Sequence, residues 1–395
     1  MKRWFKNTLI SVACLIPLAF VVGFSTNWSN KTTITSVGSS GVKPFIEELS
    51  KDYLKSHKSI DITVDAGGSG FGIDQVADGF TNIGNASKNP YSSVIDPKNE
   101  LEQKWRDKNI KTYTVAWEAI CLVYIPPKNS LITDEMLFPT DNNKSMLSVS
   151  ESTIAKLYQA FSGFADDSYM NSYPSLGDFA SEYIDSSIIS ILKNTKMIPY
   201  VRTGGSLTSG TAASFYEYSR YKNFDSKKLS SRTQKAFEVG NYGSNWKLVQ
   251  TDEANSRAWD MFSKSNTPGS VVYLSSGFIA QNENLIRKNH YGVFGYQGSN
   301  STVYSYTVEN MQNSNYDWCR PLNLMTSLDS DEGQLSFIEN FLLDDAKTKD
   351  IWNKMGAATL TQNQKNSMKK DDSYKISDFD LHDVRLDESF GAIYE

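Results

Sequence analysis

Histidine and cysteine are scarce in this sequence, with three of each among 395 residues. They are His57, His290, His382, Cys14, Cys121 and Cys319. Their spacing matches no common arrangement of metal ligands, and no histidine lies near a nucleophile motif. We therefore expect no metal site, no cofactor and no histidine-based catalytic triad. A disulfide between Cys121 and Cys319 stays open, with buried free thiols as the favoured alternative.

An excess of basic charge is also missing. The chain has 40 lysine and arginine residues against 45 aspartate and glutamate residues, a net charge of −5. This balance argues against a general binder of nucleic acid or of another polyanion. Any anion site must therefore be local, built from backbone dipoles and one or two cations. The length allows two domains, and an aromatic content of 12% argues against disorder.

Residues 1–30 have the pattern of an export segment and tether. The basic residues at the start are Lys2, Arg3 and Lys6. An apolar run from residue 9 to residue 24 follows, which suits a signal sequence or a short membrane anchor with the rest of the chain outside. Ser11–Cys14 loosely resembles a lipoprotein acceptor site, although most of the apolar run follows Cys14, and no small-x-small cleavage site is present. A retained anchor, lipidation at Cys14 and cleavage stay open, and each predicts an extracytoplasmic protein.

Beyond the tether, strand-like and helix-like segments alternate, which predicts an α/β fold. Strands are expected at 32–37, 60–66, 115–125 and 269–280, and helices at 42–54, 71–80 and 154–163, with a long helix or helix pair at 333–356. In the first helix, one face carries Val42, Phe45, Ile46, Leu49 and Tyr53, and Pro44 lies in the first turn. Residues 365–395 are charged and weakly periodic, so we predict a peripheral tail.

Three places share the order strand, Gly/Ser/Thr loop, helix. They are "VGSSGVKPF" (37–45), "DAGGSGFGI" (65–73) and "SLTSGTAASF" (206–215). A helix N-terminus offers unpaired N–H groups and a partial positive charge, so it binds small anions. Each loop alone is more often a simple turn with a helix cap. Three of them, with Arg202 before the third, favour one convergent oxyanion site.

A nucleotide site fits the second loop poorly. Gly68, Gly70 and Gly72 give the spacing G-x-G-x-G, whereas the dinucleotide fingerprint is G-x-G-x-x-G with an acidic residue about 20 positions on. The segment "TNIGNASKNP" supplies no such acidic residue. A phosphate-binding Walker loop is excluded because no G-K-[ST] follows a suitable glycine.

The same segments resemble the substrate-binding protein of ABC-type phosphate importers, in the family's order and over most of residues 34–360. The matching segments are "VGSSGVKPFIEELSKDY", "DAGGSGFGIDQVADGFTNIGNASKNP", "VAWEAICLVYIPPKNS", "YVRTGGSLTSGTAASF", "GSVVYLSSGFI" and "WCRPLNL". The resemblance implies a periplasmic-binding-protein-like (type II) venus-flytrap fold with two α/β lobes joined by two crossover strands. It implies lobe I at 31–117 and 276–370, lobe II at 118–275 and a tail at 371–395.

The resemblance also implies a function and a site. The protein is expected to be a monomer, not an enzyme, that buries inorganic phosphate between its lobes and delivers it to ABC permease subunits. The implied phosphate ligands are Ser39, Ser40, Gly41, Ser69, Ser87, Arg202, Ser209, Gly210 and Thr211. Among these, the Ser40 hydroxyl, the Gly41 backbone N–H and the Arg202 guanidinium are expected to donate hydrogen bonds to the anion.

Two departures from the family pattern affect this site. Arg202 and Ser209 are seven positions apart, where family members often have four, so the route of Arg202 to the anion is open. Lys88 follows Ser87, where many members have an aspartate that accepts the proton of hydrogen phosphate and repels sulfate. Lys88 either pairs with the anion or is solvated. Glu118 is our candidate for the proton acceptor, with a hinge carboxylate bound to backbone as the alternative, and Asp65 is a weaker candidate.

The sequence leaves three other functions open. The same fold could bind sulfate, molybdate or an organophosphate. This alternative stays open because Lys88 stands where many family members have the aspartate. A hydrolase of phosphate esters is disfavoured because no histidine or metal cluster lies near the loops. An adhesin or sensor that uses the fold as a scaffold is the third, because a fold does not by itself establish transport.

Overall fold

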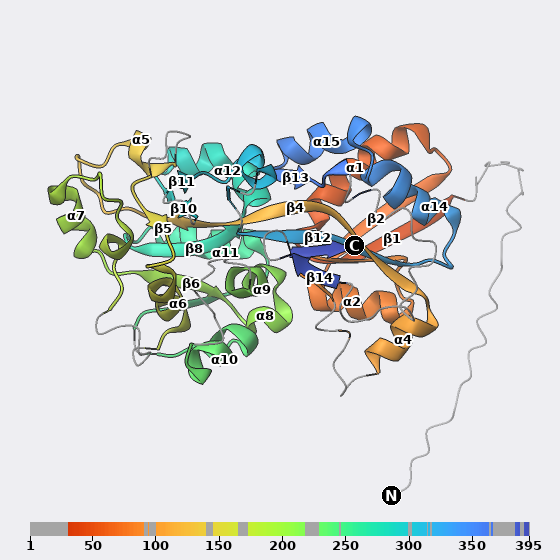
Figure 1. Cartoon of the computed structure of the whole chain (residues 1–395), viewed down its shortest axis with the longest axis horizontal. Coiled ribbons are helices and arrows are strands. Elements are labelled where there is room, and N and C mark those ends of the chain that lie inside the picture. The colour runs from red at the N-terminus through yellow and green to blue at the C-terminus, as the bar shows by residue number, and fades with distance from the viewer. Residues whose placement is uncertain are drawn as a thin grey trace, which may run out of the picture.

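The computed structural model describes residues 31–90, 94, 100–139, 145–164, 173–217, 229–244, 246–298, 302–313, 315–316, 318–362, 365, 384–387 and 391–394. The predicted export segment, with Cys14, lies outside the described residues. None of the helices in the described part reaches the length and apolar content needed to cross a membrane. The described chain forms two α/β lobes along its long axis, joined through one sheet (Figure 1). The predicted two-lobed fold is confirmed.

The first lobe is built on the half of the sheet with the order β2-β1-β3-β12-β4. Its elements are β1 (Thr32–Gly38), α1 (Lys43–Ser56), β2 (Ile60–Ala66), α2 (Ser69–Asp78), β3 (Ile83–Ala86), α4 (Leu101–Asp107), β12 (Cys319–Ser327), α14 (Glu332–Leu335), the π-helical η3 (Ser336–Leu342), α15 (Asp345–Lys354) and β13 (Ala357–Thr359). β1 pairs in parallel with β2 and β3. The carboxyl ends of these strands therefore lie at one edge of the sheet, and the loops that follow them face the same way.

The second lobe is built on the other half, with the order β4-β8-β6-β7, and on a small sheet β11-β10-β5. Its elements are α5 (Asp134–Leu137), β5 (Ser148–Val149), α6 (Ile154–Ser162), η1 (Leu176–Phe179), α7 (Ser186–Lys193), β6 (Ile198–Arg202), α8 (Gly205–Thr208), α9 (Gly210–Glu217), α10 (Ser231–Val239), β7 (Val249–Thr251), α11 (Asn255–Ser265), β8 (Ser270–Ser275), α12 (Ser276–Lys288), β9 (Gly292–Val293), β10 (Gly295–Gln297) and β11 (Val303–Tyr304). The short helix α13 (Val308–Gln312) lies against β13.

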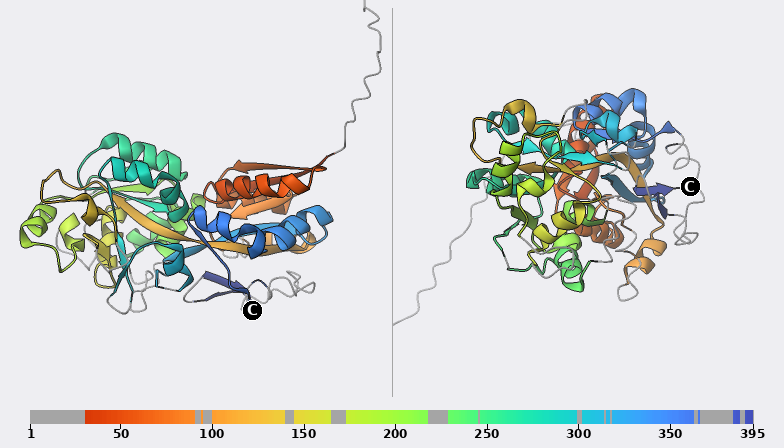
Figure 2. Two further views of the ribbon diagram at one scale, coloured as in Figure 1. Left: turned by 90° about the horizontal axis from the view of Figure 1, so that it is seen from above. Right: turned by 60° about the vertical axis from the view of Figure 1, so that its left-hand side comes forward.

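Two strands connect the lobes. β4 (Ile110–Tyr124) is buried along its whole length; it pairs with β12 up to Ala119 and with β8 from Ile120 onward. β4 thus passes from one lobe into the other, and β12 crosses beside it in the opposite direction (Figure 1, Figure 2). Cys121 and Cys319, one on each crossover strand, are buried free thiols, so the favoured alternative to a disulfide is confirmed.

Three strand pairings bear on the point at which the chain returns to the first lobe. β9 pairs with the end of β4, and β10 pairs with β5 and β11, so β9, β10 and β11 lie with the second lobe. We therefore propose that the return crossing is β12, later in the chain than residue 276. In the predicted tail, β14 (Val384–Asp387) and β15 (Gly391–Tyr394) form an antiparallel hairpin on the side of the first lobe (Figure 2).

Local signals in the sequence account for several helix boundaries. In α1 the predicted apolar face is buried and Pro44 lies in the first turn, where its missing N–H costs no hydrogen bond. α2 ends at Gly79, whose φ of 79° suits a left-handed cap. One boundary differs from the prediction. The apolar run 269–280, predicted as a single strand, divides into β8 and α12 at Ser275. The Ser275 hydroxyl caps α12 by accepting a hydrogen bond from the N–H of Phe278 at 3.4 Å.

Candidate functional site

The first two predicted anion loops are tied together by their backbones. The Gly38 carbonyl, at the end of β1, accepts hydrogen bonds from the N–H groups of Gly67 and Gly68 at 2.8 and 2.9 Å. In the first loop, the Ser39 hydroxyl accepts from the N–H of Gly41 at 3.2 Å. The loops after β1 and β2 therefore lie side by side, at the edge of the sheet that faces the second lobe.

Three buried serine residues meet at this edge, and we call Ser39, Ser69 and Ser87 the serine cluster. The Ser87 Oγ lies 2.8 Å from the Ser39 Oγ and 3.5 Å from the Ser69 Oγ, and the Ser87 N–H donates to the Ser69 Oγ at 3.1 Å. None of the three is more than 4% exposed. A hydroxyl rotates and both donates and accepts, so the cluster can turn its O–H groups toward an anion.

The third loop brings the start of α9 onto the serine cluster from the second lobe. The Ser209 hydroxyl accepts from the Ala212 N–H at 3.2 Å, and the Ser214 hydroxyl donates to the Ser87 carbonyl at 3.2 Å. A Cβ on Gly210 would lie 2.3 Å from the Ser87 Oγ and 2.5 Å from the Ser69 Oγ. Only glycine allows the two lobes to approach this closely, so the structure brings together all three predicted loops.

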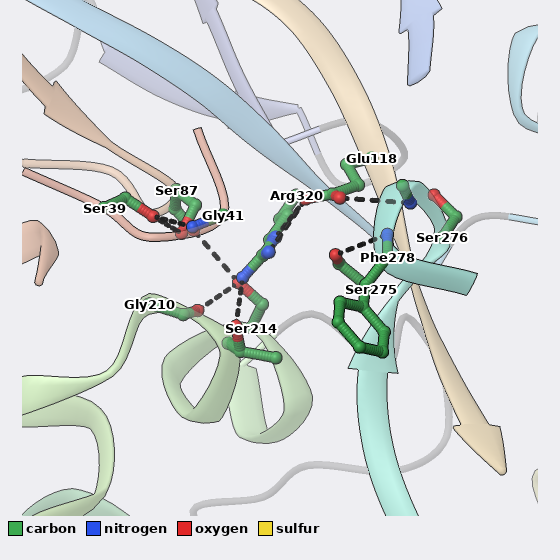
Figure 3. A network of polar contacts seen from close by, with 12 residues as sticks. Ser39, Gly41, Ser87, Glu118, Gly210, Ser214, Ser275, Ser276, Phe278 and Arg320 are labelled. Carbon is green, nitrogen blue, oxygen red and sulfur yellow. Dashed lines mark hydrogen bonds and ion pairs between the residues drawn. The ribbon is translucent and has the colours of Figure 1, made fainter. Parts of the chain in front are cut away.

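Arg320 on β12 is the cation of this junction, and it was not among the predicted site residues. Its guanidinium donates to the Glu118 Oε2 from Nε at 3.0 Å and from a terminal nitrogen at 2.8 Å, and to the Thr211 hydroxyl at 2.9 Å. Arg320 and Glu118 are fully buried. Figure 3 shows Arg320 pointing from β12 toward Gly210 and Ser214 at the start of α9. An arginine within the apolar segment "WCRPLNL" was the available signal.

Glu118 has the backbone hydrogen bond of our stated alternative, and it also pairs with a buried arginine. Arg320 donates twice to its Oε2, and the backbone N–H of Gly277 donates to its Oε1 at 3.2 Å. Both oxygens already accept hydrogen bonds, so the geometry does not favour Glu118 as the acceptor of a ligand proton. Asp65, the weaker candidate, has a side chain that is 81% exposed beside Lys43, away from the serine cluster.

Arg202 is fully buried in the second lobe. Its guanidinium donates to the Thr251 hydroxyl at 3.1 Å, to the Asn255 Oδ1 at 3.0 Å and to the Tyr273 carbonyl at 2.9 Å. Its buried Nε has no hydrogen-bond partner among the described residues. Burial lowers the pKa of this guanidinium, an effect that Arg320 increases. The long spacing to Ser209 is taken up by α8, and the described hydrogen bonds of Arg202 remain within the second lobe.

Lys88 bridges the two lobes. It is 7% exposed, and its ammonium group donates to the carbonyl of Ser206 in α8 at 3.4 Å. Its own backbone carbonyl accepts from the Asn323 side chain at 3.0 Å. The side chain is therefore not solvated, and one of its contacts holds α8 against the loop that carries Ser87.

Ser40 has a partner that the sequence did not indicate. Its hydroxyl donates to the Oε2 of Glu253, which lies between β7 and α11 in the second lobe, at 3.2 Å. Burial raises the pKa of the Glu253 carboxyl, whereas the Ser40 hydrogen bond and the charges of Arg202 and Arg320 lower it. A second carboxylate therefore lies where the first loop meets the second lobe.

A cavity of about 370 Å³ lies between the lobes beside these residues. Its first-lobe wall includes Ser40 and Gly41, and its second-lobe wall includes Asn255 and Gly277. No group of three or more histidine, cysteine, aspartate or glutamate residues in the described part is arranged to hold a metal ion. The junction offers hydroxyls, backbone N–H groups and guanidinium groups as donors to an oxyanion, beside the carboxylates of Glu118 and Glu253.

Comparison with known proteins identifies a relative along nearly the whole chain. No family model matches the chain. An uncharacterized lipoprotein of Mycoplasma genitalium is 32% identical over 384 residues, which cover 93% of this chain and 92% of the relative. The phosphate-binding protein PstS of Staphylococcus saprophyticus is 29% identical over 113 residues, 28% of this chain and 33% of that protein.

A solved structure extends the likeness to the whole fold. The putative phosphate ABC transporter substrate-binding protein of Clostridium perfringens, solved with bound phosphate, superposes with a TM-score of 0.51 at 16% identity. The match covers 84% of this chain and 100% of that one. The similarity in structure shows that the chain has the fold of a substrate-binding protein.

Proposed function

This chain belongs to the same family as the Mycoplasma genitalium lipoprotein, and we propose that it is an extracytoplasmic phosphate-binding protein that serves an ABC importer. The single observation that carries the proposal is the junction where the serine cluster, the start of α9 and Arg320 meet. Hydroxyl and N–H donors from both lobes converge there with a buried guanidinium. That set satisfies the acceptor-rich surface of a tetrahedral oxyanion.

The proposed ligands come from both lobes. They are Ser39, Ser40, Gly41, Ser69 and Ser87 from the first lobe, with Ser209, Gly210 and Thr211 from the second and Arg320 from the crossover strand. The serine hydroxyls now hydrogen-bond one another, and we propose that a bound anion replaces those contacts. We keep Arg202 as a ligand through its unpaired Nε, and Lys88 as the residue that holds α8 in place.

The proposed mechanism is lobe closure around the anion. An anion that contacts both lobes binds the closed arrangement better than the open one, so it shifts the population toward closure. The closed surface is then what membrane permease subunits of the importer would contact. We propose that the protein acts as a monomer on the extracytoplasmic face, through a membrane anchor, a lipid on Cys14 or in secreted form.

Isothermal titration with inorganic phosphate tests this function. We expect the anion-free protein to bind phosphate, and the double change Ser69→Ala with Ser87→Ala to weaken binding by about tenfold or more, because two hydroxyl donors are lost. Ser50→Ala is the matched control, since Ser50 is a buried serine of the first lobe whose hydroxyl has no described partner. Phosphate binding that survives the double change undiminished would contradict the site, and no binding by the folded wild-type protein would contradict the function.

A second candidate function is binding of another oxyanion such as sulfate, molybdate or an organophosphate. Lys88 favours this candidate, because it stands where many phosphate-binding relatives have a carboxylate that rejects anions without a proton. Competition of each anion with phosphate separates the candidates. Tighter binding of sulfate than of phosphate at neutral pH would replace the proposed ligand.

A further inference from the structure

Glu253 occupies an unusual position at the junction. It belongs to the second lobe, between β7 and α11, yet its Oε2 accepts a hydrogen bond from the hydroxyl of Ser40 in the first lobe at 3.2 Å. Ser40 belongs to the first anion loop, whose residues we propose as ligands of the anion. A carboxylate oxygen thus already lies at hydrogen-bond distance from a group that would bind the anion.

The charged groups around Glu253 come from several elements. Arg202 on β6 and Arg320 on β12 both stabilise its ionised form, and Asp252 in its own loop opposes ionisation. In the first lobe, the Ser40 hydroxyl donates a hydrogen bond to the Glu253 carboxylate. The two cations that would attract an oxyanion therefore also act on this carboxylate, and the contact with Ser40 joins it to the first anion loop.

Glu118 and Glu253 differ in their capacity to accept a further hydrogen bond. The Glu118 oxygens accept two hydrogen bonds from Arg320 and one from the Gly277 N–H, so most of the acceptor capacity of this carboxylate is used by the protein. For Glu253, the described partner of the carboxylate is the Ser40 hydroxyl on Oε2. An ionised carboxylate has about four lone-pair sites, so Glu253 retains acceptor capacity toward the ligand.

We propose that Glu253 accepts the proton of the bound oxyanion and thereby selects anions that carry one. Hydrogen phosphate keeps a proton near neutral pH and can donate it to a carboxylate, whereas sulfate has only acceptors. Two acceptors facing each other without a proton repel and stay unsatisfied in a buried site. The inference rests on the proposed function, and it assigns this selectivity to Glu253, the carboxylate with more acceptor capacity left than Glu118.

The protonation behaviour of Glu253 supports this role. Burial raises the pKa of its carboxyl above the ordinary value for glutamate, against the opposing effect of the arginines. A raised pKa brings the proton affinities of the carboxylate and of hydrogen phosphate closer together, which favours sharing a proton between them. Protonated Glu253 would donate to sulfate, so sulfate binding should tighten as the pH falls through the pKa of this group.

Glu253→Gln is the informative variant, because glutamine keeps an oxygen that accepts from Ser40 but loses the charge and can donate to an anion. Phosphate and sulfate affinities are measured by isothermal titration at neutral pH. The wild type is expected to prefer phosphate by about a hundredfold or more. The variant is expected to lose about tenfold or more of that preference, chiefly through tighter sulfate binding.

Two controls make the outcome specific. Asp260→Asn removes an exposed carboxylate of the same lobe, on α11, and it should leave the preference unchanged. Glu253→Asp keeps the charge, and it should keep most of the preference. A folded Glu253→Gln variant with the wild-type preference would overturn the inference while leaving the proposed function intact. Failure of the wild type to bind phosphate would refute the proposed function, and the inference with it.

The wild type alone provides a second measurement if the glutamine variant does not fold. The ratio of phosphate to sulfate affinity is followed from neutral to mildly acidic pH. The ratio is expected to narrow as Glu253 becomes protonated, mainly because sulfate binds more tightly. A ratio that stays constant over the range would overturn the inference.

Discussion

Replacing Arg320 by methionine is expected to lower the free energy of unfolding by about 3–5 kcal/mol, the cost of leaving one partner of a buried ion pair uncompensated. Arg320 and Glu118 are both fully buried and 2.8 Å apart, so the variant leaves the Glu118 charge without its cation. Phosphate affinity is expected to fall as well, because the buried guanidinium at the junction is lost. Urea unfolding followed by tryptophan fluorescence measures the first effect, and isothermal titration the second.

The double variant Arg320→Met with Glu118→Leu separates the two effects. Replacing both members of a buried pair by apolar side chains often restores stability. We therefore expect the double variant to regain most of the lost free energy of unfolding but not the phosphate affinity. Recovery of phosphate binding together with stability would show that Arg320 acts only on the fold. A single variant as stable as the wild type would contradict the importance of the pair.

Gly210→Ala is expected to weaken phosphate binding by about ten- to a hundredfold while both lobes stay folded. The added Cβ would lie 2.3 Å from the Ser87 Oγ and 2.5 Å from the Ser69 Oγ, so the start of α9 must move away from the serine cluster. Overpacking of this kind costs about 1–3 kcal/mol, which here opposes closure of the lobes. Isothermal titration gives the affinity, and small-angle scattering with saturating phosphate shows whether closure still occurs.

A matched glycine controls for general effects of the substitution. A Cβ on Gly298, in the second lobe, would meet its nearest neighbours at 3.8 Å, an ordinary van der Waals distance. Gly298→Ala should therefore leave phosphate affinity unchanged. If Gly210→Ala binds phosphate as tightly as Gly298→Ala does, the close approach of α9 to the serine cluster is not needed for binding.

The three anion loops are predictable from the sequence because each carries its own local signal. A strand, a glycine-rich turn with hydroxyl residues and a helix follow one another within about ten residues in each case. The apolar run around Cys121 likewise predicts the crossover strand β4, since a strand buried on both faces needs a continuous apolar sequence. The two-lobed α/β fold and the convergence of the loops can therefore be predicted from local patterns together with the family resemblance.

The charged members of the site are harder to predict, because their positions depend on distant pairings. Arg320 reaches Glu118 only through the antiparallel register of β12 and β4, which joins residues 202 positions apart. Glu253 meets Ser40 only where the lobes touch, across 213 positions. The sequence around each residue gives no sign of its partner. The sequence indicates Glu118 as a carboxylate of the junction, but its pairing with Arg320 and Gly277 is a tertiary property.

The longer loop between Arg202 and Ser209 also has a structure that the sequence does not predict. The seven positions from Arg202 to Ser209 indicate a longer loop, but nothing in that segment predicts that it forms α8. α8 in turn supplies the Ser206 carbonyl to which Lys88 donates. The sequence leaves Lys88 between an anion ligand and a solvated side chain, whereas the structure gives it a third role as a contact between the lobes.

The central claim is that one tetrahedral oxyanion binds between the lobes, and its most direct test is a crystal structure with arsenate, a phosphate analogue with an anomalous X-ray signal. The account predicts a single arsenic peak whose oxygens lie within about 3.2 Å of donors from the Ser39–Gly41 loop and from the start of α9. A peak elsewhere, or no peak at a saturating concentration of arsenate, would contradict it.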